Sequence, residues 1–183
     1  MIRGFATALL VAFSLAPALA ANDRYPHATM MGKIAAQPDP DATLGGVQLF
    51  VRAGLDRETG AQNGFAALLA EIVARTPVAV GVGGVSLPLR DAIAGLGANL
   101  TVTVEPQDTR YYVEGRPAAL AAALPLLGDA LASPDFSFKV VDASKTALRA
   151  RIGDADQSPF GVVASMLRSA YYPGSGAGFS PSG

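Results

Sequence analysis

The sequence predicts an α+β fold in which helices pack on a mainly antiparallel sheet. The first observation is a run at 47–54 that alternates apolar and polar residues, as a half-buried strand does. The second is a pair of alternating runs at 99–115, separated by the turn "PQD", which predicts a β-hairpin. The third is that apolar residues recur at helical spacing in much of the remaining chain. Because a hairpin is antiparallel, this order favours α+β over a parallel α/β sheet.

Ahead of the first helix, the sequence predicts a linker, a strand and a loop. Residues 21–43 are rich in proline and polar residues, which indicates a linker that can include a short edge strand. The strand at 47–54 follows, and "LDRETGAQN" has the composition of a loop. Asn63 is a suitable N-cap for a helix that starts at Gly64, and Pro77 marks the end of this helix.

A second helix and the hairpin are expected in the middle of the chain. Ser86 is a suitable cap for the helix "LPLRDAIAGL", which follows a flexible glycine-rich crossing, and Gly97 is placed to stop it. The hairpin at 99–115 then begins with "NLTVTVE", whose alternation puts apolar side chains on one face. Thr101 and Thr103 lie on its polar face.

Three further helices are expected after the hairpin. Pro117 occupies a plausible first helical position, and "FSFKVVDASKTALRARI" at 136–152 forms the second of these helices. Ser158 is followed by proline, which is typical of a capped helix start. The apolar stripes of the first and third helices predict buried core positions: Leu120, Leu124, Leu127 and Leu131, then Phe160, Val163, Leu167 and Tyr171.

The helix that starts at Gly64 has an unusual distribution of residues around its axis. One face carries the spacing of a core stripe: Phe65, Leu68, Leu69, Ile72 and Val73. The opposite face is nearly blank, with one carboxylate among alanines: Ala67, Ala70, Glu71 and Ala74. Because exposed helix faces are usually charged, this face is expected to meet another part of the protein or to line a cavity. The alternative is an ordinary alanine-rich helix covered by packing.

The N-terminus has the pattern of a secretory signal peptide over residues 1–20. Arg3 supplies the positive charge, and "FATALLVAFSLA" is an apolar run of a dozen residues. This run is shorter than the roughly 20 residues that span a bilayer. The pattern "ALA" predicts cleavage near Ala20, and therefore a secreted or periplasmic chain that is free of the membrane. The alternative is an uncleaved anchor.

Composition excludes several functional classes. Half of the 183 residues are apolar and 16% are charged, which indicates a globular chain. The net charge of -1 and the absence of a basic run argue against nucleic-acid binding and a polybasic membrane patch. There is no cysteine, so thiolate zinc sites and cysteine nucleophiles are excluded. His27, in the segment after the signal, is the single histidine, which argues against a catalytic triad and a histidine zinc site.

Two other patterns are weak candidates for chemistry. "GVGGVS" at 81–86 precedes a predicted helix, as phosphate-binding loops do. Ser86 stands where the G-x-G-x-x-G pattern needs glycine, however, and no lysine follows as in a P-loop. Glu105 and Asp108 could form a carboxylate pair, but a turn between strands explains both acids.

Several segments, taken in order, resemble a known family. They are "VRAGLDRETGAQNG", "GFAALLAEIV", "LRDAIAGLGANLTVTVEPQDTRYYVEG", "ALPLLGDALASPDF", "SKTALRARIGDADQSP" and "YYPGSGAGFSPSG". Together they resemble the N-terminal domain of the insulinase and mitochondrial-processing-peptidase family, the inverzincin metallopeptidases. The resemblance covers roughly residue 44 to the end. It implies that 44–183 is this peptidase domain, incomplete at its C-terminus.

The family's zinc motif is degenerate in this sequence. The signature is H-x-x-E-H on a helix, where the histidines bind zinc and the glutamate is the general base. In the register of the resemblance, Ala67 and Glu71 stand at the histidines and Ala70 stands at the glutamate. Ser144 and Arg151 replace two family glutamates, and Arg151 stands at the third zinc ligand. The resemblance implies a zinc cofactor, but these departures predict no metal, no other cofactor and no catalytic residue here. Arg151 could instead pair with Glu71.

The resemblance implies a role in proteolysis without catalysis by this chain. The family often works as pairs of related halves, and we expect a non-catalytic partner of a zinc-bearing homologous subunit, or of a second domain of the same chain. A peptide substrate could contact the hairpin edge through Thr101 and Thr103, although both threonines could simply be solvated. The alternative function is a stand-alone peptide- or protein-binding module in the exported compartment.

Overall fold

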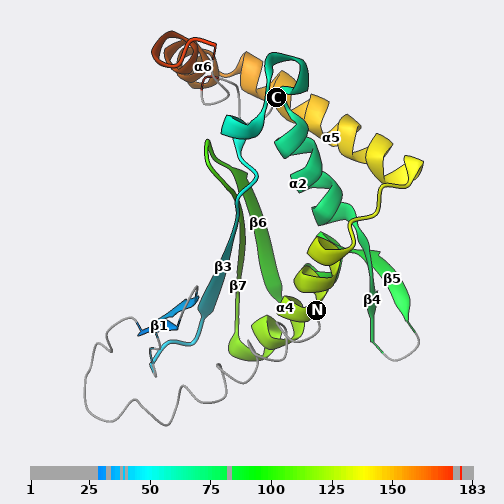
Figure 1. Cartoon of the computed structure of the whole chain (residues 1–183). Helices are drawn as coiled ribbons and strands as arrows, with labels where there is room; N and C mark the ends of the chain where they lie inside the picture. Colours follow the sequence, from blue (N-terminus) through cyan, green and yellow to red (C-terminus); the bar gives the residue numbers. More distant parts are fainter. Residues whose placement is uncertain are drawn as a thin grey trace.

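The structure is a computed structural model that describes residues 29–31, 34–37, 39, 41–81, 84–174 and 178. Its centre is an antiparallel sheet with the strand order β3-β7-β6 (Figure 1). The strands are β3 (Gly45–Val51), β6 (Ala98–Val104) and β7 (Thr109–Gly115). The predicted hairpin is confirmed, since β6 and β7 pair in register from Ala98 opposite Gly115 to Val104 opposite Thr109. The predicted α+β fold is also confirmed.

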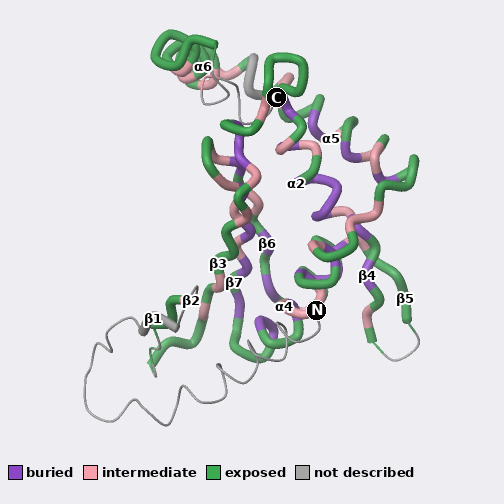
Figure 2. The backbone as a smooth tube through the Cα atoms, viewed as in Figure 1, coloured by how far each residue is buried: buried purple, intermediate pink, exposed green. Residues whose placement is uncertain are grey.

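Helices cover one face of this sheet and bury its apolar side chains (Figure 2). They are α2 (Phe65–Arg75), α3 (Leu89–Gly95) and α4 (Pro117–Ala132). Leu100, Tyr111 and Val113 from the sheet join Leu89, Ile93, Leu120 and Ala123 from the helices in the main core. Burial raises the pKa of Tyr111 to about 12. The other sheet face is more exposed, as is common for antiparallel sheets.

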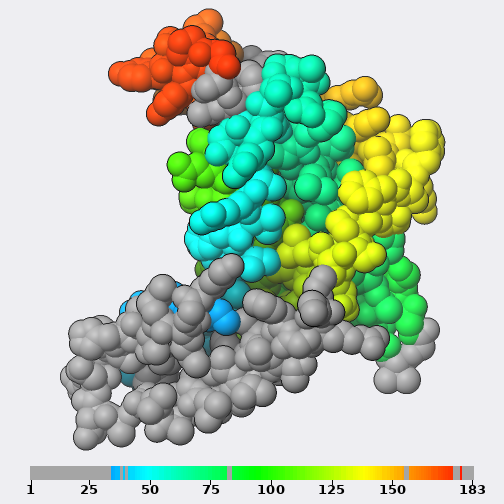
Figure 3. All heavy atoms as spheres, viewed as in Figure 1, coloured from blue at the N-terminus to red at the C-terminus, as the bar shows by residue number. Residues whose placement is uncertain are grey.

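Two long helices complete the chain. Helix α5 (Phe138–Gln157) packs along α2, and α6 (Pro159–Tyr171) contacts α5. Figure 3 shows α6, in orange and red, protruding from the rest of the molecule. The prediction that its stripe is buried is wrong, because Phe160 is 88% and Tyr171 78% exposed. No other described element than α5 packs closely on α6, so its apolar face stays open.

A second hairpin was not predicted. Strands β4 (Pro77–Val80) and β5 (Val85–Pro88) pair antiparallel, where the sequence indicated a glycine-rich crossing and a capped helix. Ser86 therefore lies in a strand, and its assignment as a helix cap is wrong. Helix α3 begins at Leu89 instead. Two shorter strands, β1 (Thr29–Met31) and β2 (Ile34–Ala36), also pair with each other.

The N-terminus of α2 is capped differently from the prediction. Gly64, not Asn63, is the N-cap, and its φ of 91° lies in the left-handed region that glycine adopts without strain. The Glu58 carboxylate accepts hydrogen bonds from the backbone N–H groups of Gly64 at 2.9 Å and Ala66 at 2.6 Å. Glu58 lies between η2 (Leu55–Arg57) and η3 (Gly60–Gln62), two short 3-10 turns.

Other predicted ends are confirmed. Gly97 has φ 79° just after α3, and Pro117 is the first residue of α4. The Ser158 hydroxyl accepts a hydrogen bond from the backbone N–H of Gly161 at 3.4 Å, which caps α6. Each of these ends depends on local chemistry that the sequence displays directly.

The two faces of α2 exchange the roles that the core-stripe pattern indicated. Phe65 is 58% and Leu69 36% exposed, so this end of the predicted core stripe faces outward. The alanine face is buried instead: Ala67, Ala70, Glu71 and Ala74. Because α2 is packed between the sheet and α5, its small side chains permit the close approach of both neighbours. The expectation that this face meets another part of the protein is confirmed.

Some predictions fall outside the described part of the chain. The signal peptide at 1–20 and His27 lie there, as does most of the linker before Ile34. Within the described residues, no helix combines the length and the apolar character that a bilayer crossing requires.

Candidate functional site

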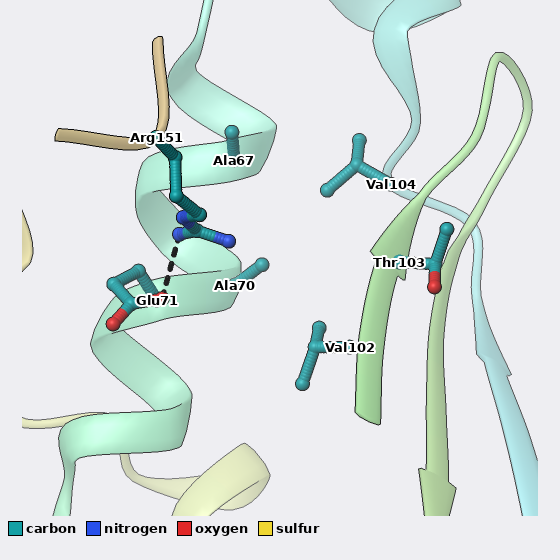
Figure 4. A pocket seen from close by; sticks show the side chains of 7 residues that line it. All are labelled: Ala67, Ala70, Glu71, Val102, Thr103, Val104 and Arg151. Carbon is teal, nitrogen blue, oxygen red and sulfur yellow. Dashed lines mark hydrogen bonds and ion pairs between the residues drawn. The ribbon is translucent and has the colours of Figure 1, made fainter. Parts of the chain in front are cut away.

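The nearly blank face of α2 lines a hollow between this helix and strand β6. The hollow has a volume of about 180 Å³. Its walls come from α2, from β6 and from α5 (Figure 4): Ala67, Ala70, Glu71, Val102, Thr103, Val104 and Arg151. Space remains because an alanine side chain ends at Cβ, so neither Ala67 nor Ala70 reaches across to Val102 and Val104.

Glu71 is the charged centre of this site. It is 2% exposed, and Nη2 of Arg151 donates a hydrogen bond to its Oε2 at 2.7 Å. Nε of Arg75 donates to Oε1 at 2.8 Å, and Nη2 of Arg90 lies 3.8 Å from Oε2. A buried carboxylate is costly unless it is paired, and here both oxygens are paired. The predicted pairing of Arg151 with Glu71 is confirmed.

The four charged residues come from three helices. Glu71 and Arg75 are one turn apart on α2, while Arg90 lies on α3 and Arg151 on α5. Sequence analysis did not identify Arg75 or Arg90. The i,i+4 spacing could have revealed Arg75, because residues four apart are neighbours on a helix. Arg90 carries no such local signal, since only the packing of α3 on α2 brings it near Glu71.

Ser144, the other replaced family position, does not join this cluster. It lies on α5 with no exposed surface, and it is not among the residues that line the hollow. Its Oγ is buried without a hydrogen-bond partner. The two substitutions on α5 therefore have different environments, since Arg151 reaches the hollow and is half exposed.

The residues at this position do not fit a zinc ion. Zinc in proteins takes thiolate sulfur, imidazole nitrogen or carboxylate oxygen ligands. Ala67 and Ala70 offer none of these, and both oxygens of Glu71 already accept hydrogen bonds from guanidinium groups. Arg151 adds a fixed positive charge. Among the described residues, no group of three or more His, Cys, Asp or Glu side chains is placed to hold a metal.

Thr101 and Thr103 are exposed and lie on the opposite face of β6 from the hollow's apolar wall. The Thr103 side chain points away from the hollow in Figure 4, although its backbone borders it. A second, shallower hollow of about 300 Å³ covers this outer face, lined by Gln48, Thr101, Thr103, Glu105, Arg110 and Tyr112. Strand β6 is an edge strand, since β7 is its one partner in the described sheet. Its other side can therefore accept an added strand.

The remaining candidates resolve into ordinary structure. Arg110 donates to Asp108 at 2.8 Å and lies 3.8 Å from Glu105, and its guanidinium also lies 5.5 Å from the centre of the Phe50 ring. Both acids therefore belong to the β6–β7 turn. In "GVGGVS", Ser86 is in a strand, and 82–83 lie outside the described residues. The first turn of a helix does not follow this loop directly, which removes the basis for a phosphate site.

Three comparisons place this fold among known proteins. The family model described as Insulinase (Peptidase family M16) matches residues 33–180. A search of curated proteins finds no match. The fold is similar to a protease from Helicobacter pylori, with a TM-score of 0.68 and 16% identity over 86% of this chain and 38% of that chain.

Two further solved structures are similar. One is a peptidase M16 inactive domain from Pseudomonas fluorescens, with a TM-score of 0.61 and 18% identity over 78% of this chain and 34% of that chain. The other is pitrilysin, with a TM-score of 0.66 and 21% identity over 80% of this chain and 15% of that chain. The chain therefore spans well under half the length of each of these proteins, and the likeness concerns the fold.

Proposed function

We propose that this chain, which belongs to the insulinase family (peptidase family M16), is a non-catalytic half of an exported zinc peptidase. The observation that carries the proposal is the ion pair between Arg151 and Glu71. In the register of the family motif, these residues stand at two zinc ligand positions. A guanidinium at 2.7 Å from the carboxylate takes up the place and the oxygen that a metal would need.

The chemistry of the site supports a silent rather than an active half. Peptide hydrolysis by this family needs a zinc-bound water and a general base. Ala70 stands at the general base and can neither accept nor hold a proton. Glu71, the remaining carboxylate of the motif, is held by guanidinium groups on both oxygens. We therefore expect the chain to bind no zinc and to hydrolyse no peptide by itself.

The family relationship supports a partner. Members of this family often work as paired subunits, and the chain is also similar in fold to an inactive M16 domain. The partner would be a zinc-bearing homologous subunit or a second domain of the same chain. The free edge of β6 beside the hollow is where the pair would hold an extended peptide, with Thr101 and Thr103 on the exposed face. Export rests on the signal pattern at 1–20.

Affinity purification of the tagged mature chain from its own host tests this proposal. Mass spectrometry is expected to find a family member with an intact H-x-x-E-H in stoichiometric amount. Metal analysis of the separated chain is expected to find zinc well below one equivalent. Zinc near one equivalent, or peptidase activity of the chain alone, would overturn the silent role. A zinc-bearing homologue that is fully active and never associates would overturn the partnership.

The second candidate function is a stand-alone peptide-binding module. The observation that favours it is the edge strand β6, which needs no partner subunit to accept an extended peptide. In the same purification, this function predicts that the chain runs alone. The purified chain would then still bind peptides.

A further inference from the structure

The charged cluster at the hollow carries more positive than negative charge. One carboxylate, Glu71, faces the guanidinium groups of Arg75, Arg90 and Arg151 within 4 Å. The carboxylate therefore neutralises one of three positive charges. The two others must be balanced by solvent, by counterions or by a bound anion. Such an excess next to a partly enclosed, apolar-walled space attracts negatively charged groups.

Arg151 is the arginine that presents this charge to the hollow. It lines the hollow, whereas Arg75 and Arg90 do not. Its side chain is 50% exposed, and Nη2 donates to Glu71. A guanidinium has five N–H donors, and within the described residues no other hydrogen bond or ion pair uses those of Arg151. A second carboxylate can therefore bind to the same guanidinium from the hollow side.

The size of the hollow limits the ligand to a single small group. Its volume of about 180 Å³ corresponds to roughly six water molecules at about 30 Å³ each. Sites for small molecules and cofactors are usually larger, about 300–1,000 Å³. The side walls are Ala67 and Ala70 on one side and Val102 and Val104 on the other. Apolar walls with a cation at one end suit a short aliphatic stem that ends in a carboxylate.

The position of the hollow indicates that the ligand belongs to a peptide. Residues 102–104 of β6 form one wall, and β6 is an edge strand of the described sheet. A strand added to this edge would run beside the hollow, with alternate side chains on the two faces of the sheet. Every second side chain would then point toward α2. A carboxylate at such a position could reach Arg151.

We infer that the hollow is a carboxylate-binding pocket for an extended peptide along β6. The carboxylate is an Asp or Glu side chain or the C-terminal group of the peptide. This inference rests on the peptide-binding role of β6 in the proposed function, and it does not depend on the partner subunit. It gives the degenerate zinc position a task of its own, which is the selection of acidic peptides.

Binding of matched peptides to the purified chain tests this inference. The probes are an extended peptide of alternating valine and threonine with one central glutamate, and the same peptide with glutamine. Each is made with a free C-terminus and as an amide, so that side-chain and terminal carboxylates are distinguished. Fluorescence anisotropy in metal-free buffer measures the dissociation constants. A charged hydrogen bond lost is expected to weaken binding roughly 10- to 100-fold.

The variant Arg151→Met is expected to remove the preference for the acidic peptide and to leave the affinity for the neutral peptide unchanged. The matched control is Arg75→Met, which also loses a contact to Glu71 but does not line the hollow. Arg151→Lys keeps the charge and is expected to keep part of the preference. Both variants leave Glu71 with other arginine partners.

The outcomes separate this inference from the function on which it rests. Equal affinity for all four peptides would overturn the carboxylate pocket while leaving β6 as a peptide-binding edge. A preference that survives Arg151→Met would also overturn it. Absence of binding by every peptide would overturn both the pocket and the peptide role of β6. Co-purification of a zinc-bearing homologue would still stand or fall by its own measurement.

Discussion

At the scale of single residues, Glu71 is the group whose loss is expected to cost most. Its carboxylate is buried and ties α2 to α3 and α5 through Arg90 and Arg151. Breaking a buried pair costs about 3–5 kcal/mol when a charge stays buried alone. The arginines here are 36–50% exposed and can rehydrate, so Glu71→Ala is expected to cost less, about 2–3 kcal/mol. Urea unfolding measures this change.

Arg151→Met is the matched control for this prediction. It removes one guanidinium but leaves Glu71 with Arg75 and Arg90. The buried carboxylate therefore stays paired, and we expect a loss of about 1 kcal/mol or less. Equal unfolding midpoints for the Glu71→Ala and Arg151→Met variants would show that the carboxylate does not organise the cluster.

The second residue-scale prediction concerns Ser144. Its hydroxyl is buried without a partner, so Ser144→Ala removes an unsatisfied polar group and is expected to be neutral or to stabilise by up to about 1 kcal/mol. Thr76→Val is the contrasting variant. The Thr76 hydroxyl donates to the Ile72 carbonyl at 3.0 Å and accepts from the Asp135 N–H at 3.1 Å. Its loss is expected to cost about 1–3 kcal/mol in the same unfolding assay.

At the scale of elements, the start of α2 depends on Glu58. Its carboxylate accepts from two backbone N–H groups of the first turn, those of Gly64 and Ala66. It also places negative charge at the helix N-terminus, where the dipole favours it. Glu58→Ala is therefore expected to cost about 1 kcal/mol. Hydrogen exchange should speed up at the first turn of α2 and stay unchanged in α4, and uniform loss of protection would contradict this local role.

The same element shows how far local sequence patterns predict structure. Asn63 was the expected cap because it precedes the helix, but the group that caps α2 comes from Glu58, six residues before Gly64. The hairpin at 98–115 and the cap at Ser158 were predictable because their signals lie within a few residues. The β4–β5 hairpin was missed because its strands are four residues each, too short to show alternation, and Ser86 followed by proline is also typical of a helix start.

The candidate site was predictable in part for a different reason. The register of the family motif placed Arg151 and Glu71 at one location although 80 positions separate them, and the structure brings them into contact. Arg90 was missed because its position depends on how α3 packs, which no local pattern encodes. The faces of α2 were misassigned because apolar spacing identifies one buried face, whereas this helix is packed on two sides.

At the scale of the whole molecule, the main unbalanced feature is the exposed apolar surface of α6. Its stripe runs through Phe160, Val163, Leu167 and Tyr171, and each of these is at least 54% exposed. A continuous apolar stripe of this kind favours association in water. We expect the purified chain to self-associate with rising concentration in sedimentation velocity. The double variant Phe160→Gln, Leu167→Gln is expected to shift it toward the monomer without loss of helical circular dichroism.

Phe138→Gln is the matched control, because Phe138 is 86% exposed but lies at the start of α5. A helix of 20 residues is about 30 Å long, so this side chain is far from the stripe on α6. Its substitution removes as much exposed aromatic surface as that of Phe160, yet it leaves the stripe intact. If self-association requires a continuous stripe, Phe138→Gln changes little. An equal effect of both variants would indicate non-specific apolar contact, and a wild-type chain that stays monomeric would remove the prediction altogether.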